Sequence, residues 1–179
     1  MTFKPSKPIS AVELMRRLQS DPEWARENAK REAEHWAAVE KRRHEIEPEE
    51  IPLLAKLAAV GIHIDSIWDL VNAKWAYPEA IPVLAVYLGQ AKHPVLREGI
   101  ARALTVPEAR GVAGRAILTE LQRPLDQSPH AVRWVLANAL TVVGDESMED
   151  AIRALISDDQ YSDVRERLSS ALAKLRRGA

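Results

Sequence analysis

The sequence predicts an all-α protein built from repeated helix pairs, and three observations support this prediction. A phrase with the pattern apolar-Arg-x-x-apolar-small-x-Ala-Leu occurs three times, and its arginine recurs after 36 and then 32 residues. Self-similarity at a period of roughly 30 to 47 residues marks helical repeat arrays. A second phrase, PEEIPLLA from Pro48, returns 30 residues later as PEAIPVLA from Pro78. No segment shows several cycles of the period-2 alternation expected of a half-buried strand.

Both phrases are predicted to be helical. In the first phrase the shared apolar positions fall at i, i+4, i+7 and i+8, which is one buried face of a helix. In the second phrase, proline and glutamate occupy the first turn, where proline lacks an N–H that would be unpaired anyway and glutamate complements the helix dipole. The copies of the first phrase are LREGIARAL from Leu96, VRWVLANAL from Val132 and VRERLSSAL from Val164.

These phrases divide residues 47–179 into four helix pairs. Gln122–Gln127 has the composition of a loop and lengthens the third pair. Asp65 is the predicted N-cap of the second helix in the first pair. The predicted helices are 48–59 and 65–74, 78–90 and 94–105, 107–122 and 129–143, and 147–156 and 162–177.

Residues 1–46 are predicted to form a helical extension without repeats. Ser10 and Glu13 form a capping-box pattern that predicts a short helix through Leu18. A longer, highly charged helix is predicted from Pro22 to about residue 46, with a thin apolar stripe that includes Trp24 and Trp36. This helix either caps the array, as exposed ends of repeat arrays require, or offers its tryptophans to a partner.

Composition limits the classes of function. The net charge is −1, with 25 basic and 26 acidic residues, so no global basic excess is present to hold nucleic acid. Cysteine is absent, which excludes disulfides and thiolate chemistry. No apolar run reaches the ~18 residues of a membrane span, and the first residues do not resemble a signal peptide, so we expect a cytoplasmic protein.

The second-helix phrases resemble HEAT-like repeats, particularly the short type named after phycobilin-lyase proteins. The resemblance covers roughly residues 47–176, clearly from residue 77 onward, and does not extend to residues 1–46. It implies a right-handed α-solenoid of about four antiparallel helix pairs, with a concave surface lined by the second helices. Most members of this group are interaction scaffolds, and fold alone does not specify function.

The repeated arginines Arg97, Arg133 and Arg165 are predicted to be structural. We expect each to pair with an acidic residue or a carbonyl in the adjacent turn. The alternative is an evenly spaced basic row for phosphates or for an acidic partner.

The positions between the repeated core residues carry the prediction of recognition. Trp134 either anchors a partner, as tryptophan often does at interfaces, or fills space against the longer loop of the third pair. Trp68, Trp75 and Tyr77 are expected to be core. The candidate partner-binding residues are Glu98, Arg102, Trp134, Asn138 and Glu166.

No motif predicts catalysis, a cofactor or a metal. The chain lacks a glycine-rich phosphate loop, a Gly-x-Ser-x-Gly elbow and a His-Glu-x-x-His motif. Some HEAT-like proteins bind two irons through His-Glu pairs, but here the single His-Glu dipeptide, His44-Glu45, lies outside the repeats. Bilin lyases and DNA alkylpurine glycosylases also use this fold. No residue supports the former, and residues 51–179 contain equal numbers of basic and acidic residues, which does not favour the latter.

The sequence therefore predicts a non-catalytic scaffold that binds another protein through the concave second-helix face. One concrete form is a small immunity or inhibitor protein that covers a toxin's active site, which rests on size and class alone. The first alternative is a nucleic-acid-binding protein such as a DNA alkylpurine glycosylase. The second is an enzyme acting on a small molecule.

Overall fold

The computed structural model describes residue 10, residues 21–124 and residues 127–175, and within these ranges the chain is all-α. Eight α-helices and three short 3-10 helices occur there, and no strand, so the predicted all-α class is confirmed. The chain divides into two compact units, an N-terminal unit of residues 1–45 and a main unit of residues 46–179. Helix α2 begins in the first unit and ends in the second, and the units are described separately.

Helix α2 spans Pro22–Ala59 and contains Pro48 and Pro52. The prediction of two helices separated near residue 47 is therefore wrong. Proline at these positions removes hydrogen bonds from the helix ladder. Asp21 precedes the helix, and its carboxylate oxygen accepts hydrogen bonds from the backbone N–H groups of Glu23 at 2.9 Å and Trp24 at 3.4 Å.

In the N-terminal unit, the helix is a charged, solvent-exposed rod. Every residue from 29 to 45 is exposed, and Trp36 is 66% exposed. Lys30 pairs with Glu34 at 3.9 Å, an i,i+4 contact that stabilises isolated helices modestly. The short helix predicted for residues 10–18 lies outside the described residues, apart from Ser10.

In the main unit, α3 (Ile67–Val71) is short and begins with a capping box. Ser66 is the N-cap, and the Asp69 carboxylate accepts a hydrogen bond from the Ser66 backbone N–H at 3.0 Å. The prediction of Asp65 as N-cap is wrong, because Ser66 carries the reciprocal contact three residues before Asp69. Glu50 of α2, which is 4% exposed, also accepts the Ser66 hydroxyl and the Ile67 N–H, each at 2.9 Å.

The neighbouring residue Glu49 makes the corresponding contact one pair later. Its Oε2 accepts the backbone N–H groups of Lys92 at 2.7 Å and His93 at 3.2 Å. His93 is the N-cap of α5 (Pro94–Ala103). Two adjacent carboxylates of α2 therefore bind the backbone at the beginnings of α3 and α5.

The first helices α4 (Ala80–Leu88) and α6 (Gly114–Leu121) precede α5 and α7 in the chain. The predicted continuous helix over 107–122 is wrong, since Pro107–Ala109 forms a 3-10 turn and α6 begins only at Gly114. Gly111 has a φ of 78°, a left-handed conformation that ends any right-handed helix there and that glycine adopts without strain.

The remaining helices are α7 (His130–Val143), α8 (Glu149–Ser157) and α9 (Arg165–Leu175). The 3-10 turns Glu146–Met148 and Asp159–Tyr161 precede α8 and α9. The last residues of the predicted helix 162–177 lie outside the described residues.

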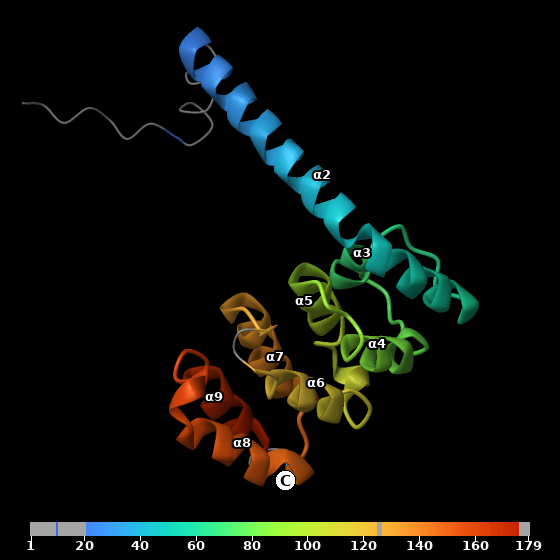
Figure 1. Cartoon of the computed structure of the whole chain (residues 1–179), viewed down its shortest axis with the longest axis vertical. Helices are drawn as coiled ribbons and strands as arrows, with labels where there is room; N and C mark the ends of the chain where they lie inside the picture. Colours follow the sequence, from blue (N-terminus) through green and yellow to red (C-terminus); the bar gives the residue numbers. More distant parts are fainter. Residues whose placement is uncertain (1–9, 11–20, 125–126, 176–179) are drawn as a thin grey trace, which may run out of the picture. The chain divides into compact units, whose positions relative to one another are not determined.

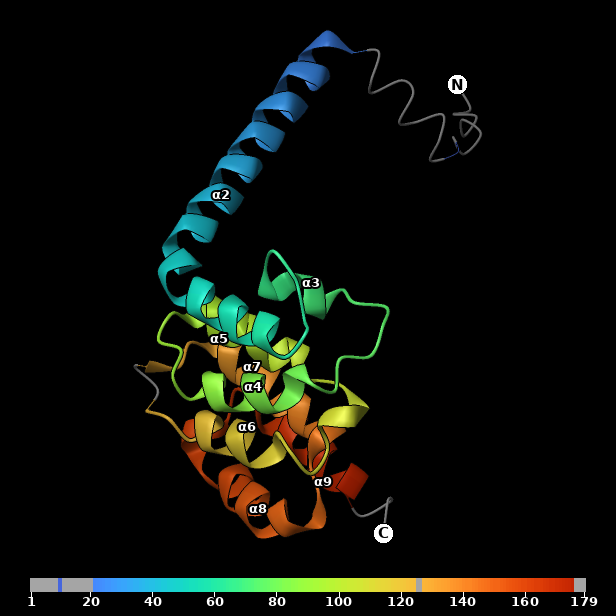
Figure 2. The ribbon, with the colours of Figure 1, turned by 90° about the vertical axis from the view of Figure 1, so that its right-hand side faces the viewer.

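The main unit has two sets of helices. Alternate helices pack in chain order, α3 against α5, α5 against α7 and α7 against α9, while α4 packs on α6. The first helices α4, α6 and α8 also pack on the helices that follow them, α5, α7 and α9. Figures 1 and 2 show α4, α6 and α8 succeeding one another through the unit. One apolar core extends from Ile46 to Leu175, and no helix among the described residues is long and apolar enough to cross a membrane.

Candidate functional site

The first repeated arginine, Arg97, lies inside the main unit. It is only 1% exposed, and its Nε donates to Glu120 Oε1 at 2.6 Å. It also donates to the backbone carbonyl of Gln127 and, at 3.3 Å, to Ser128 Oγ. Glu120, itself 2% exposed, accepts a second arginine, Arg123, at 2.8 Å. Arg97 on α5 therefore binds both helix α6 and the segment that leads into α7.

The second repeated arginine, Arg133, makes the same kind of contact one pair later. It is 7% exposed, forms an ion pair with Asp163 and donates to the carbonyl of Gln160 at 3.4 Å. Both partners precede α9, as Gln127 and Ser128 precede α7. Asp163 also contacts His130 Nδ1 at 2.7 Å. Burial alone would raise the pKa of Asp163, but hydrogen bonds and charge from Arg133 and His130 hold that pKa below its ordinary value.

The third repeated arginine, Arg165, differs. Its side chain is 40% exposed, and its partner Asp159, six residues earlier, is fully exposed and 2.9 Å away. No described helix follows α9 for it to bind. Since Arg97 and Arg133 are buried and paired, the three arginines do not form an exposed basic row.

The candidate contact residues on α5 are paired with each other. Arg102 Nε and Nη2 both donate to Glu98 Oε1, at 2.9 and 2.8 Å, across one helical turn. The side chains are 41% and 22% exposed. This pair is neutral overall and remains accessible to solvent.

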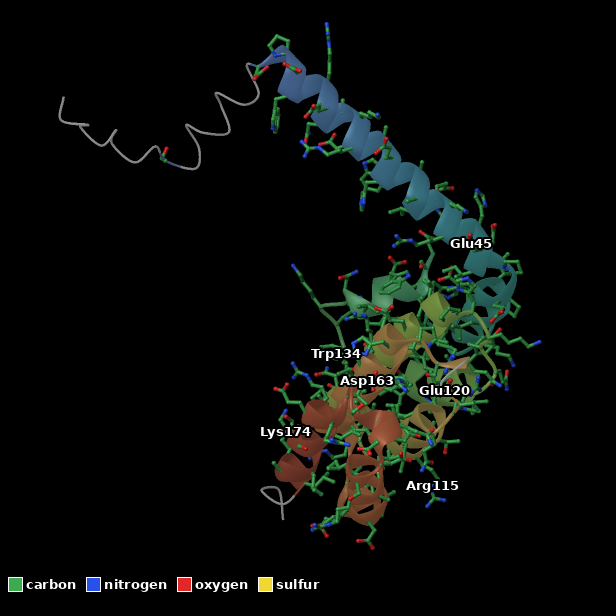
Figure 3. The ribbon with its side chains drawn as sticks, turned by 60° about the vertical axis from the view of Figure 1, so that its left-hand side comes forward. Glu45, Arg115, Glu120, Trp134, Asp163 and Lys174 are labelled. Carbon is green, nitrogen blue, oxygen red and sulfur yellow. The ribbon has the colours of Figure 1, made fainter. Side chains whose placement is uncertain are left out.

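Trp134 on α7 is partly buried against the core, and the guanidinium carbon of Arg167 on α9 lies 4.8 Å from its ring centroid. This is a cation–π contact between successive second helices. The nearby amide of Asn138 on α7 and carboxylate of Glu166 on α9 form no hydrogen bond or ion pair within the described residues. Figure 3 shows Trp134 on α7 and, well apart from it, Arg115 on α6, which serves below as a control position.

Two further residues are added to this surface. Arg167 was missed by the sequence analysis, and Trp68, which was expected to be core, is only partly buried against it. A Cβ on Gly99 would lie 2.8 Å from Ile67 Cγ2 and 3.7 Å from Trp68 Cε2, so α3 approaches α5 most closely at Ile67, with Trp68 beside it. The sequence signal was Gly99 itself, a glycine within a helix where the next copy has Val135. The five candidates and these two residues are called the second-helix surface, and its members are Trp68, Glu98, Arg102, Trp134, Asn138, Glu166 and Arg167.

The aromatic residues between α3 and α4 divide into buried and exposed members. Tyr77 is 5% exposed and donates to the carbonyl of Ala103 at 2.8 Å, whereas Trp75, which meets it edge to face at 5.6 Å, is 49% exposed. Burial and the charge of Glu108 raise the pKa of Tyr77. Both aromatic residues line a cavity of about 360 Å³ that also reaches Arg102.

No group of three histidine, aspartate, glutamate or cysteine residues able to hold a metal ion occurs in the described part of the chain. Comparison with known proteins finds no match, whether to a protein-family model, to a curated protein or to a solved structure.

Proposed function

We propose that the main unit is a HEAT-like, right-handed α-solenoid of about four helix pairs. The in-order packing of α3, α5, α7 and α9 supports this proposal. So do the contacts of Arg97 and Arg133, each of which connects one second helix to the segment before the next. Arg165 has no described helix after α9 to bind, and it pairs instead with Asp159 in the preceding turn.

The second-helix surface binds a protein partner, without catalysis. This proposal rests on one observation. Helices α5, α7 and α9 all bury the repeated apolar positions, but the residues between those positions differ from helix to helix. Asn138 and Glu166 have polar groups unused within the described chain, and Trp134 offers an aromatic surface beside them. Aromatic and arginine side chains on a preorganised face are typical of interface hot spots.

Mixed charge favours a protein over a nucleic acid as the partner. Glu98 and Arg102 neutralise each other, and Glu166 lies next to Arg167, whereas a nucleic-acid interface needs a contiguous basic stripe. An immunity or inhibitor protein remains one concrete form of the proposal.

A small-molecule enzyme is less well supported. The raised pKa of Tyr77 goes with a buried hydroxyl that already donates to a backbone carbonyl.

Co-purification followed by a binding measurement tests the proposal. A partner captured with the full chain is identified and purified, and its Kd is measured by calorimetry for wild type, Trp134→Ala and Arg102→Glu. We expect each substitution to weaken binding about tenfold or more.

Arg115→Glu is the matched control, because it reverses the same charge at an exposed position on α6. Binding that survives both Trp134→Ala and Arg102→Glu, or that Arg115→Glu weakens equally, would contradict the proposed surface.

A further inference from the structure

A second surface lies along the C-terminal part of α2 and the segment around α3. The C-terminal part of α2 buries Ile46, Glu50, Leu53 and Leu57 and leaves a different face open. That face, with the segment around α3, lines a groove of about 760 Å³. The lining residues are Ile51, Leu54, Ala55, Ala58, His63, Ile64, Asp65, Asp69 and Trp75.

The corresponding face of the next first helix is covered. The 30-residue offset between the Pro-Glu phrases aligns Ile51, Leu54 and Ala58 with α4 positions that are no more than 2% exposed. Ile51, in contrast, is 57% exposed. The aligned residues of α4 are Ile81, Leu84 and Leu88.

The spacing of the open face indicates what would cover it. Ile51, Leu54, Ala55 and Ala58 stand at i, i+3, i+4 and i+7, the arrangement by which one helix packs its ridge into the groove of another. Since α4 is buried at these positions, the open face of α2 is an apolar helix face that a further helix would cover.

The rim of the groove is acidic. Asp69 Oδ2 is held by the backbone N–H groups of Asp65 and Ser66, each at 3.0 Å, and the carboxylate of Asp65 has no hydrogen-bond or ion-pair partner in the described chain. His63 is the one other titratable residue of the lining, which contains no lysine or arginine among the described residues. A helix that docks here therefore gains from basic residues beside its apolar stripe.

We propose that this groove binds a basic amphipathic helix of a partner protein, with the apolar stripe of that helix on Ile51, Leu54 and Ala58 and its lysines or arginines beside Asp65 and Asp69. The groove shares Trp75 with the cavity that reaches Arg102, but its lining contains no member of the second-helix surface, so the two proposals can be tested separately.

The probe is a synthetic N-capped peptide of about 18 residues, long enough to be helical, with leucines at i, i+3, i+4 and i+7 and lysines on both flanks. Its affinity for the full chain is measured by calorimetry, and the indole N–H signals are followed by NMR. We expect binding that moves the Trp75 signal and leaves the Trp36 signal unchanged. A peptide with glutamates in place of the lysines is expected to bind at least about tenfold more weakly.

Two variants and one control locate the site. Ile51→Asp should weaken the basic peptide about tenfold or more, whereas Val86→Asp, at a similarly exposed apolar position (64%) on α4, should not. Asp65→Lys should reduce the preference for the basic over the acidic peptide.

Equal affinity for the two peptides, or an equal loss from Ile51→Asp and Val86→Asp, would overturn the proposal. So would a wild-type dimer that Ile51→Asp converts to a monomer, because the occupant would then be a second copy.

Discussion

Arg97 and Arg165 occupy the same position of the repeated phrase, yet Arg97 is enclosed and Arg165 is open to solvent. Arg97 binds Glu120 and the carbonyl of Gln127, which belong to the next helix pair, whereas Arg165 binds only Asp159 in its own turn. This arginine therefore acts between helix pairs, and its contribution to stability depends on the pair that follows it in the described chain. Substitutions at Arg97, Arg133 and Arg165 test this difference.

The largest effect is expected for Arg97→Ala. This change leaves Glu120 buried with only Arg123 as a charged partner, so we expect a loss of about 3 kcal/mol in the free energy of unfolding, measured by urea denaturation. The double variant Arg97→Met with Glu120→Leu should recover most of the loss, since it removes both buried charges. A single-variant loss under about 1 kcal/mol would contradict the structural role.

Arg133→Ala should have the next largest effect. Arg133 is nearly as buried as Arg97, but its partner Asp163 retains His130 and partial access to solvent. We expect a loss of about 2 kcal/mol, in the range for hydrogen bonds to charged groups, by the same measurement. A loss greater than that of Arg97→Ala would reverse the proposed ranking.

The Asp163 contact predicts a dependence on pH. Because the folded-state pKa of Asp163 is lowered, its carboxylate contributes stability fully above its ordinary pKa of about 4 and loses it as the pH falls through the lower folded-state pKa. The stability difference between wild type and Asp163→Asn should therefore shrink as the pH falls through the acid range. Urea denaturation at a series of pH values measures this difference, and a difference that stays constant into acid would count against the contact.

Arg165→Ala should have the smallest effect. Its pair with Asp159 is exposed, and such pairs contribute about 0 to 1 kcal/mol. We expect a loss of about 0.5 kcal/mol or less in the same denaturation assay. If the loss equalled that of Arg133→Ala, the contrast between Arg165 and the two buried arginines would fail.

Sequence periodicity was sufficient to predict the helices of the main unit because each buries an apolar face at helical spacing. It failed where a single backbone angle decides the outcome. The predicted helix 107–122 contains suitable residues, but Gly111 adopts a positive φ, and no pattern of hydrophobicity encodes that choice. The prolines of α2 caused the opposite error. They predicted a boundary between two helices, where the structure has one continuous helix.

The surroundings of the candidate residues were less predictable. The sequence predicted that Arg97 pairs with an acidic residue or a carbonyl, but the choice of Glu120 depends on how α6 packs beside α5. Arg167 and Trp134, which are also in contact, are 33 positions apart in the sequence. Partners separated this far come from tertiary packing, which single-sequence periodicity does not reach.

The adjacent carboxylates of Glu49 and Glu50 have a consequence for cooperativity. Glu50 binds the start of α3 and Glu49 binds the backbone that enters α5, so the last turns of α2 bind two successive second helices at once. Local opening of α2 would release the amides of Ile67 and Lys92 together, and the first two helix pairs would open as one cooperative unit rather than in sequence.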